Sequence, residues 1–266
     1  MQIIDDRLDL EAYFVELGKS RQSLLLLDYD GTLAPFREER DQAVPYPGIV
    51  ERLELLKSNL RTHTAVISGR WSKDLIPLLG MAKPPEIWGC HGVERPDGSI
   101  VGVRPEVAVA LSEAEIWAEQ IGLTGYSERK PISLAFHWRG LPEGDTARIR
   151  NEVTAKWPLD EEQQGLILKE FDGGLELRPV GLDKGGAVKA ILERTEKSDP
   201  VAYLGDDFTD EDAFEELGDR GLKVLVRKES RETKADLRLE PPKELLAFLD
   251  RWIASQQGEA GQAQGR

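Results

Sequence analysis

The chain has 266 residues, of which 40% are apolar, and it carries a formal net charge of −14 with a single cysteine. This length suits one main core with a smaller inserted domain. The charge argues against a nucleic acid or an anionic membrane as partner, and no apolar run approaches the ~20 residues of a membrane span. Cys90 alone excludes an internal disulfide. We therefore expect a cytoplasmic protein that acts on a small molecule. No sequence feature fixes its oligomeric state, and a monomer is the simplest expectation.

The first part of the chain alternates between helical and strand-like patterns. In chain order the sequence predicts a helix over 5–18, a strand over 23–28, a helix over 47–60, a strand over 64–68, a helical or turn-like segment over 75–79 and a strand over 87–94. Strands that alternate with helices favour a parallel sheet with right-handed crossovers, so we expect an α/β fold.

The pattern changes after residue 105. The sequence then predicts a helix over 106–121, strands near 126–130 and 132–139, a helix over 143–157, and strands over 166–171 and 175–178. This αββ-αββ order indicates a compact α+β insert. The parallel pattern then returns, with a helix over 184–196, a strand over 201–205, a helix over 210–217 and a strand over 223–226. We expect a core of residues 1–105 and 180–254, an insert of 106–179, and a disordered tail at 255–266.

Two aspartates end the first buried strand. Residues 24–33 read Leu-Leu-Leu-Leu-Asp-Tyr-Asp-Gly-Thr-Leu, which would deliver Asp28 and Asp30 to the carboxyl edge of a parallel sheet. Like charges this close favour a neutralising cation, and a carboxylate can attack phosphorus. An acidic turn after a core strand is the alternative interpretation.

Three further segments are expected at the same edge of the sheet. Ser68 ends the second strand and could hydrogen-bond a phosphoryl oxygen, although it could also be a plain turn residue. Lys184 begins a helix, either as a fixed cation beside the site or as a solvated helix start. Asp206 opens a cluster of aspartates after an apolar strand, and this cluster could instead cap the next helix. The four segments together point to phosphoryl transfer.

In these four motifs the chain resembles the haloacid dehalogenase superfamily of phosphohydrolases, which have a Rossmann-like α/β core with an inserted cap. The resemblance implies that Asp28 is the nucleophile, and that Asp30 protonates the leaving oxygen and then activates water. It also implies Mg²⁺ held by Asp28, the backbone carbonyl of Asp30 and Asp206, with Asp207 and Asp210 as outer carboxylates. Since a nearby metal disfavours a protonated acid, the side chain of Asp30 should point away from the ion.

Further motifs resemble the trehalose-6-phosphate phosphatase family over residues 24–250. They are Asp-Tyr-Asp-Gly-Thr-Leu at 28–33, Ile-Ser-Gly-Arg at 67–70, Gly-Cys-His-Gly-Val-Glu at 89–94, Lys-Pro-Ile-Ser-Leu-Ala-Phe-His-Trp-Arg at 130–139, Leu-Glu-Leu-Arg-Pro at 175–179 and Gly-Asp-Asp-Phe-Thr-Asp-Glu at 205–211. By this resemblance the insert is a lid of the C2 cap type that binds the sugar. The substrate that the resemblance implies is trehalose 6-phosphate, hydrolysed to trehalose and phosphate through an aspartyl-phosphate intermediate.

The resemblance also implies which residues bind the sugar phosphate. Trehalose hydroxyls would contact Lys130, Arg139 and Glu176 of the insert, and the core side of the cleft would be lined by Arg70, His91 and Gly92. Even spacing along the strand at 132–139 puts polar side chains on one face, although such a face could simply be solvated. We expect the lid to close over the core, with hinges near 104–105 and 179–181.

Two alternatives stay open at this point. Another sugar-phosphate phosphatase of the same fold, acting on sucrose phosphate or a glycosyl-phosphoglycerate, would share the core motifs. A sugar-phosphate sensor with an inactive core is the alternative that is not an enzyme. Against the sensor, the sequence keeps Asp28, Asp30, Lys184 and Asp206 together.

Overall fold

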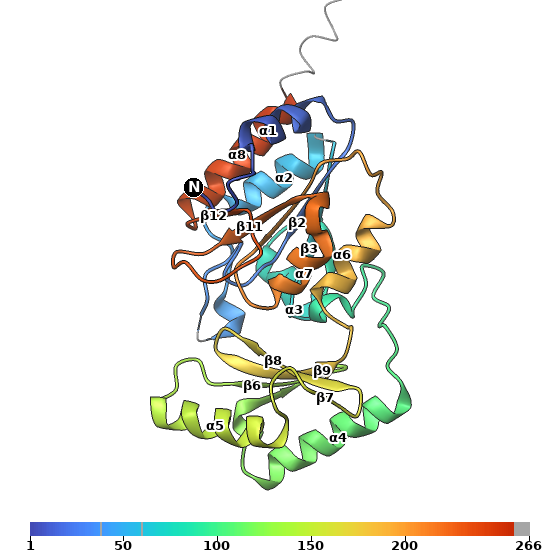
Figure 1. Ribbon diagram of the computed structural model, residues 1–266, viewed down its shortest axis with the longest axis vertical. Helices are drawn as coiled ribbons and strands as arrows, with labels where there is room; N and C mark the ends of the chain where they lie inside the picture. The colour runs from blue at the N-terminus through green and yellow to red at the C-terminus, as the bar shows by residue number, and fades with distance from the viewer. Residues whose placement is uncertain (38, 60, 258–266) are drawn as a thin grey trace, which may run out of the picture.

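A seven-stranded sheet forms the centre of the larger of two parts of the molecule (Figure 1). The structure is a computed structural model that describes residues 1–37, 39–59 and 61–257. Across the sheet the strands run in the order β1 (Gln2–Ile3), β12 (Leu237–Leu239), β11 (Leu222–Val226), β10 (Val201–Gly205), β2 (Ser23–Leu27), β3 (Thr62–Ile67) and β4 (Glu86–Trp88). All neighbours pair in parallel except β1 with β12. The predicted parallel α/β fold is confirmed.

Strand β2 is apolar along its length because helices cover both faces of the sheet. Leu25 and Leu27 join one core cluster, and Leu24 and Leu26 join the other. The first cluster includes residues of α1 (Leu10–Lys19), α2 (Ile49–Asn59), α3 (Ser72–Leu79) and α8 (Lys243–Gln257), and the second includes residues of α6 (Lys184–Leu192) and α7 (Asp210–Leu217). The strand therefore delivers its carboxyl end rigidly to the edge of the sheet.

A five-stranded antiparallel sheet forms the smaller part, which we call the small part and which spans residues 105–179. Its order is β5 (Ser127–Arg129), β6 (Leu134–His137), β9 (Gly174–Pro179), β8 (Leu166–Phe171) and β7 (Glu162–Gln163), with helices α4 (Pro105–Gln120) and α5 (Glu143–Lys156). The two helices cover the face of this sheet that points away from the large part, and the opposite face is turned toward the large part (Figure 1). That second face is therefore not simply solvated.

The strand predicted over 87–94 is wrong beyond Trp88. Strand β4 ends there, and the chain turns through a short 3₁₀ segment, η2 (Cys90–Gly92). The φ angles of Cys90, His91 and Gly92 are 49°, 57° and 94°, which are incompatible with a strand. The remaining 3₁₀ turns are η1 (Arg40–Gln42), η3 (Thr124–Tyr126) and η4 (Gly218–Arg220).

Among the described strands and α-helices, three strands and one helix were not predicted from the sequence, namely β1, β7, β12 and α8. Helix α8 continues to Gln257, so residues 255–257 of the expected disordered tail are helical. Residues 258–266 lie outside the described residues. In the part of the chain that the structure describes, no helix is both long and apolar enough to cross a membrane.

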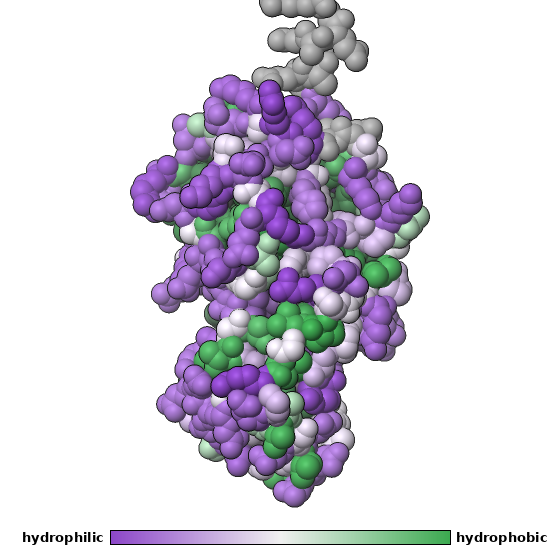
Figure 2. Space-filling view, turned by 90° about the vertical axis from the view of Figure 1, so that its right-hand side faces the viewer, coloured by the Kyte–Doolittle hydropathy of each residue, from purple (hydrophilic) through white to green (hydrophobic). Residues whose placement is uncertain are grey.

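The chain crosses between the two parts on the side shown in Figure 2, where apolar surface gathers near their junction. The buried residues Cys90 and Val93 of the large part and Ile132 of the small part pack together at the junction. Partly buried side chains around them come from both crossings and include Val101, Val103 and Leu182. This side of the junction is thus held by apolar contacts.

Candidate active site

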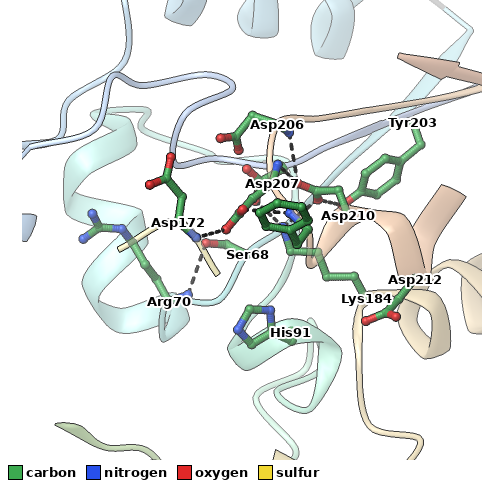
Figure 3. Close-up of polar contacts among 12 residues, drawn as sticks. Ser68, Arg70, His91, Asp172, Lys184, Tyr203, Asp206, Asp207, Asp210 and Asp212 are labelled. Carbon is green, nitrogen blue, oxygen red and sulfur yellow. Dashed lines mark hydrogen bonds and ion pairs between the residues drawn. The ribbon is translucent and has the colours of Figure 1, made fainter. Parts of the chain in front are cut away.

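Three buried carboxylates meet at the carboxyl edge of the large sheet. Asp28 follows β2. Asp206 follows β10 and Asp210 begins α7, and Figure 3 shows these two side chains. Strands β2 and β10 pair in parallel with Leu27 opposite Leu204, so both chains leave the sheet at the same level. One oxygen from each carboxylate lies within 4.8 Å of the others. The topology therefore brings distant aspartates together, as the sequence predicts for parallel strands.

Asp210 orders this cluster through four hydrogen bonds. The backbone N–H groups of Asp206 and Asp207 donate to its Oδ2 at 3.0 and 2.9 Å. Its Oδ1 accepts from Tyr203 Oη and from Lys184 Nζ, each at 2.6 Å. Because both oxygens are already occupied by protein donors, Asp210 acts as a support for the loop and the lysine.

Lys184 joins the cluster to Asp28, which directly follows β2. Its Nζ lies 2.6 Å from Asp28 Oδ1 as well as from Asp210, and all three side chains are buried. Burial alone would lower the pKa of Lys184, but the two carboxylates raise it, so the side chain is an ammonium. One positive charge therefore faces three acidic side chains.

Burial and the neighbouring carboxylates raise the pKa values of two of these aspartates. For Asp28 burial is the largest cause, Lys184 opposes it, Asp210 adds to it, and the pKa is raised to about 7. For Asp206 burial and then Asp28 hold the pKa well above its usual range. A cation bound between them would reverse this balance.

The donor set fits a hard divalent cation. Asp206 Oδ1 is buried and has no hydrogen-bond partner among the described residues. Asp28 and Asp206 thus supply two carboxylates with room for water or phosphate oxygens, which suits Mg²⁺. Gly31 makes the approach possible, because a Cβ at this position would lie 2.2 Å from Asp206 Oδ2.

Asp30 lies apart from the three-carboxylate cluster. Both of its oxygens accept from Arg70, with Nε–Oδ2 and Nη2–Oδ1 distances of 2.7 Å. Its side chain is 28% exposed, whereas Arg70 is only 6% exposed. Ser68 is also buried, and its Oγ accepts from the backbone N–H of Arg70 at 3.2 Å, which leaves its hydroxyl hydrogen available to another acceptor.

A cavity lies between the two parts. From the large part it is lined by Asp28, Asp30, Arg70, His91, Lys184 and Asp206, and from the small part by Lys130, Arg139 and Glu176. The structure therefore brings nine of the predicted site residues to one cavity.

Glu176 connects the two parts at this cavity. Its Oε1 accepts from Lys130 Nζ at 2.8 Å and from Ser133 Oγ at 2.7 Å, and its Oε2 lies 2.9 Å from His91 Nε2. Burial opposes ionisation, but Lys130 and then His91 hold the pKa of Glu176 well below its usual range. Burial lowers the pKa of His91 despite the carboxylate, so the neutral ring donates from Nε2.

Two other predicted sugar-binding residues have protein partners. The Arg139 guanidinium lies 4.0 Å from the centre of the Phe36 ring and donates to the backbone carbonyl of Asp172. Gly92 brings η2 against α6, since a Cβ there would lie 2.6 Å from the Cβ of Ala187. The close packing that Gly92 allows between η2 and α6 thus sets the position of His91, the residue before it.

Contacts at the tip of the β8–β9 hairpin also bind the small part to the large part. The backbone N–H of Asp172 donates to Asp207 Oδ2 at 2.8 Å, and Asp172 Oδ2 lies 3.2 Å from Arg227 Nη2. Arg178 and Asp212 form an ion pair of 2.5 Å. The structure therefore shows the two parts closed on each other.

Nothing in the sequence pattern singles out Tyr203, Asp172 or Phe36. Tyr203 lies inside an apolar strand, and only the contact of its hydroxyl with Asp210 shows its role. Asp172 lies in the turn between β8 and β9, and the sequence of a turn does not reveal that it docks against Asp207.

Comparison with known proteins identifies the family. A family model described as trehalose-phosphatase matches residues 26–243. The chain is 34% identical over 262 residues to a trehalose-phosphate phosphatase of Mycobacterium tuberculosis, covering 91% of this chain but 63% of the relative. It is 27% identical over 281 residues to a probable trehalose-phosphate phosphatase H of Arabidopsis thaliana, covering 96% of this chain and 78% of the relative.

Solved structures share the fold. The C-terminal domain of Candida albicans trehalose-6-phosphate phosphatase has a TM-score of 0.72 at 22% identity, covering 93% of this chain and 98% of that one. The C-terminal domain of the Candida albicans trehalose synthase regulatory protein has a TM-score of 0.67 at 14% identity, covering 94% and 100%. With its motifs gathered at one sheet edge and a family model that spans most of its length, the chain belongs to the trehalose-phosphatase family.

Proposed function

We propose that the protein hydrolyses trehalose 6-phosphate to trehalose and inorganic phosphate. The observation that carries this proposal is the shared cavity, in which Asp28, Lys184 and Asp206 face the polar sheet surface of the small part. The family membership supports the same reaction. The chain spans 63% of the length of its mycobacterial relatives, so activity and substrate are proposed for this chain itself.

In the first step, Asp28 attacks the phosphorus atom. An Asp28–phosphorus bond forms as the bond between phosphorus and the sugar oxygen breaks, and the sugar oxygen keeps the electron pair. Asp30 gives its proton to that oxygen. We propose that Lys184 and the hydroxyl of Ser68 stabilise the charge on the phosphoryl oxygens.

In the second step, Asp30 removes a proton from a water molecule. The resulting hydroxide attacks phosphorus, the bond to Asp28 breaks, and the electron pair returns to the Asp28 carboxylate. Inorganic phosphate leaves, and Asp30 carries the proton needed for the next cycle. Two easier steps thus replace one difficult displacement.

We propose Mg²⁺ as the cofactor, held by Asp28, Asp206 and the backbone carbonyl of Asp30. Oδ1 of Asp206, which has no hydrogen-bond partner among the described residues, supports this assignment. When bound, the ion neutralises phosphate oxygens and positions the phosphoryl group. Asp207 and Asp210 remain as supports, because Asp210 already accepts four hydrogen bonds.

We propose that residues 106–179 form a lid over a core of 1–105 and 180–254. Lys130 and Glu176 would exchange their mutual contact for sugar hydroxyls, with His91 on the core side. Arg139 and Gly92 would act mainly by placing Phe36, the hairpin and η2. We further propose that the protein works in the cytoplasm as a monomer. The single, buried cysteine fits a reducing compartment and has no bearing on the oligomeric state.

A panel of sugar phosphates tests this proposal. Phosphate release is measured with trehalose 6-phosphate, sucrose phosphate and a glucosyl-phosphoglycerate, each with Mg²⁺ and with EDTA. Trehalose 6-phosphate is expected to give the highest kcat/KM by at least about tenfold, with activity lost in EDTA. A tenfold preference for another substrate would overturn the assignment.

The inactive-sensor alternative is tested separately. Asp28→Asn should abolish phosphate release while the purified variant still binds the sugar phosphate. If the wild-type protein bound trehalose 6-phosphate without releasing phosphate, the chain would be a sensor.

A further inference from the structure

The ion pair between Arg70 and Asp30 fixes the orientation of a carboxyl group. Two parallel hydrogen bonds of 2.7 Å join Nε and Nη2 of Arg70 to the two oxygens of Asp30. A guanidinium bound in this way holds the plane of the carboxylate as well as its position. A single ammonium could not do so, because it presents a point charge.

Arg70 is itself anchored to the large part. Its backbone N–H donates to Ser68 Oγ at 3.2 Å, and its carbonyl accepts from the N–H of Cys90 at 2.8 Å. Its guanidinium lies 5.8 Å from the centre of the Tyr29 ring. With 6% exposure, the side chain cannot reach far into the cavity without breaking the pair.

Asp30 needs such a support. Its side chain lines the cavity and is 28% exposed, and no other residue makes a hydrogen bond to its carboxyl oxygens in the described part of the chain. A carboxylate has about four lone-pair directions, of which Arg70 uses two. The other two remain free to carry a proton to or from the reacting oxygen.

We infer that Arg70 is a positioning residue that orients Asp30 for proton transfer, rather than a ligand of the sugar. This inference rests on the proposed function, in which Asp30 protonates the leaving oxygen. Losing the orientation slows only reactions whose leaving group needs that proton. A sugar alkoxide needs it, whereas a nitrophenolate leaves without it.

A series of aryl phosphates with graded leaving-group acidity separates the two roles. For Arg70→Ala, kcat/KM for trehalose 6-phosphate is expected to fall about 10²-fold, the lower range for general acid catalysis. For p-nitrophenyl phosphate the expected change is under about threefold. The plot of log kcat/KM against leaving-group pKa should therefore steepen. A sugar-binding role predicts an unchanged slope.

Asp30→Asn and the double variant complete the test. Asp30→Asn should steepen the slope in the same way. Adding Arg70→Ala to Asp30→Asn should then change kcat/KM by less than about threefold, because both substitutions remove the same proton transfer. Multiplying effects would overturn the inference, as would an equal loss on every substrate. Arg70→Lys, which keeps the charge without the fork, should give an intermediate slope and decides the matter if Arg70→Ala does not fold.

The aryl series also separates this inference from the substrate assignment. If the slope steepens while the wild-type protein does not hydrolyse trehalose 6-phosphate, only the assigned sugar is wrong. If trehalose 6-phosphate is hydrolysed but the slope of Arg70→Ala equals that of the wild type, the role given to Arg70 is wrong.

Discussion

Asp28, Asp206 and Asp210 are buried together, and the single ammonium of Lys184 does not balance them. Such a cluster costs stability in the absence of a cation, because burial disfavours the charged forms. Spacing in the sequence predicted which residues would meet, since each follows a strand or begins a helix at the same sheet edge. The sequence could not predict which of these aspartates is free to hold a cation and which supports the loop, because that depends on which carboxylate oxygens already accept hydrogen bonds.

Removing the charge of Asp28 should stabilise the metal-free protein. Burial raises the Asp28 pKa from 3.8 to about 7, so between these values the folded protein holds a proton that the unfolded chain has released. Stability therefore falls as pH rises through this window. Asp28→Asn lacks this loss, and its melting temperature in EDTA at pH 8 should exceed that of the wild type.

Differential scanning fluorimetry in EDTA from pH 4.5 to 8 measures this effect. Mg²⁺ serves as the control condition, because it should raise the wild-type melting temperature more than that of the variant. A variant less stable than the wild type at pH 8 in EDTA would show that Asp28 is not charge-strained in the folded protein.

Gly31→Ala should weaken metal binding. Gly31 has a φ of 84°, and the added Cβ would lie 2.2 Å from Asp206 Oδ2, so the carboxylate must move. A displacement of a ligand at this scale should raise the Mg²⁺ concentration needed for half-maximal phosphate release by about 10-fold or more. The measurement is a Mg²⁺ titration of activity together with a melting curve.

Gly80→Ala is the matched control for the backbone strain. Gly80 also has a positive φ, 65°, but an added Cβ meets nothing within 4 Å among the described residues. Both variants should lose roughly 1 kcal/mol from the strained backbone. Only Gly31→Ala should change the Mg²⁺ dependence; an equal change in both would attribute the effect to strain alone.

The sequence predicted helices and strands best where the pattern of apolar residues was long and regular. The helix expected over 106–121 is α4, and the strand over 201–205 is β10. The strand expected over 87–94 is wrong beyond Trp88, because the sequence pattern does not reveal that residues 90–92 adopt positive φ angles. Helix α8 had a readable signal, with buried Leu245, Phe248, Leu249 and Trp252 at helical spacing.

Helix α8 stabilises the large part but contributes no residue to the lining of the cavity. Trp252 is fully buried and its Nε1 donates to Thr62 Oγ1 at 2.9 Å, and the helix lies at the far end from the junction of the two parts (Figure 1). Trp252→Ala should reduce the free energy of unfolding by about 3–5 kcal/mol, with kcat unchanged within about twofold in the folded protein. Urea unfolding and steady-state kinetics measure the two effects.

The exposed Gln257 of the same helix provides the control. Gln257→Ala should change the free energy of unfolding by less than about 0.5 kcal/mol. A fall in kcat for Trp252→Ala at temperatures where it remains folded would mean that α8 influences the active site.

At the scale of the whole molecule, the sequence could predict two sheets and two chain crossings, but not how the two parts meet. Contacts such as Glu176 with His91 and Asp172 with Asp207 join elements that no local pattern relates. The junction has two characters: apolar packing around the crossings, and hydrogen bonds and ion pairs around the cavity. Polar contacts exchange readily with water, so this arrangement favours opening at the cavity side while the crossings stay packed.

Opening and closing should therefore be measurable in solution. Without ligand, the radius of gyration from small-angle scattering should exceed the value with Mg²⁺, vanadate and trehalose, because water can replace the polar contacts across the junction when the cavity side opens. Asp212→Asn weakens the ion pair with Arg178 across the junction and should raise KM several-fold and enlarge the ligand-free radius. Asp250→Asn, which weakens the 2.7 Å pair with Arg52 within the large part, should change neither quantity. Equal radii with and without the ligands would mean that the closed arrangement is permanent, and substrate would then need another way into the cavity.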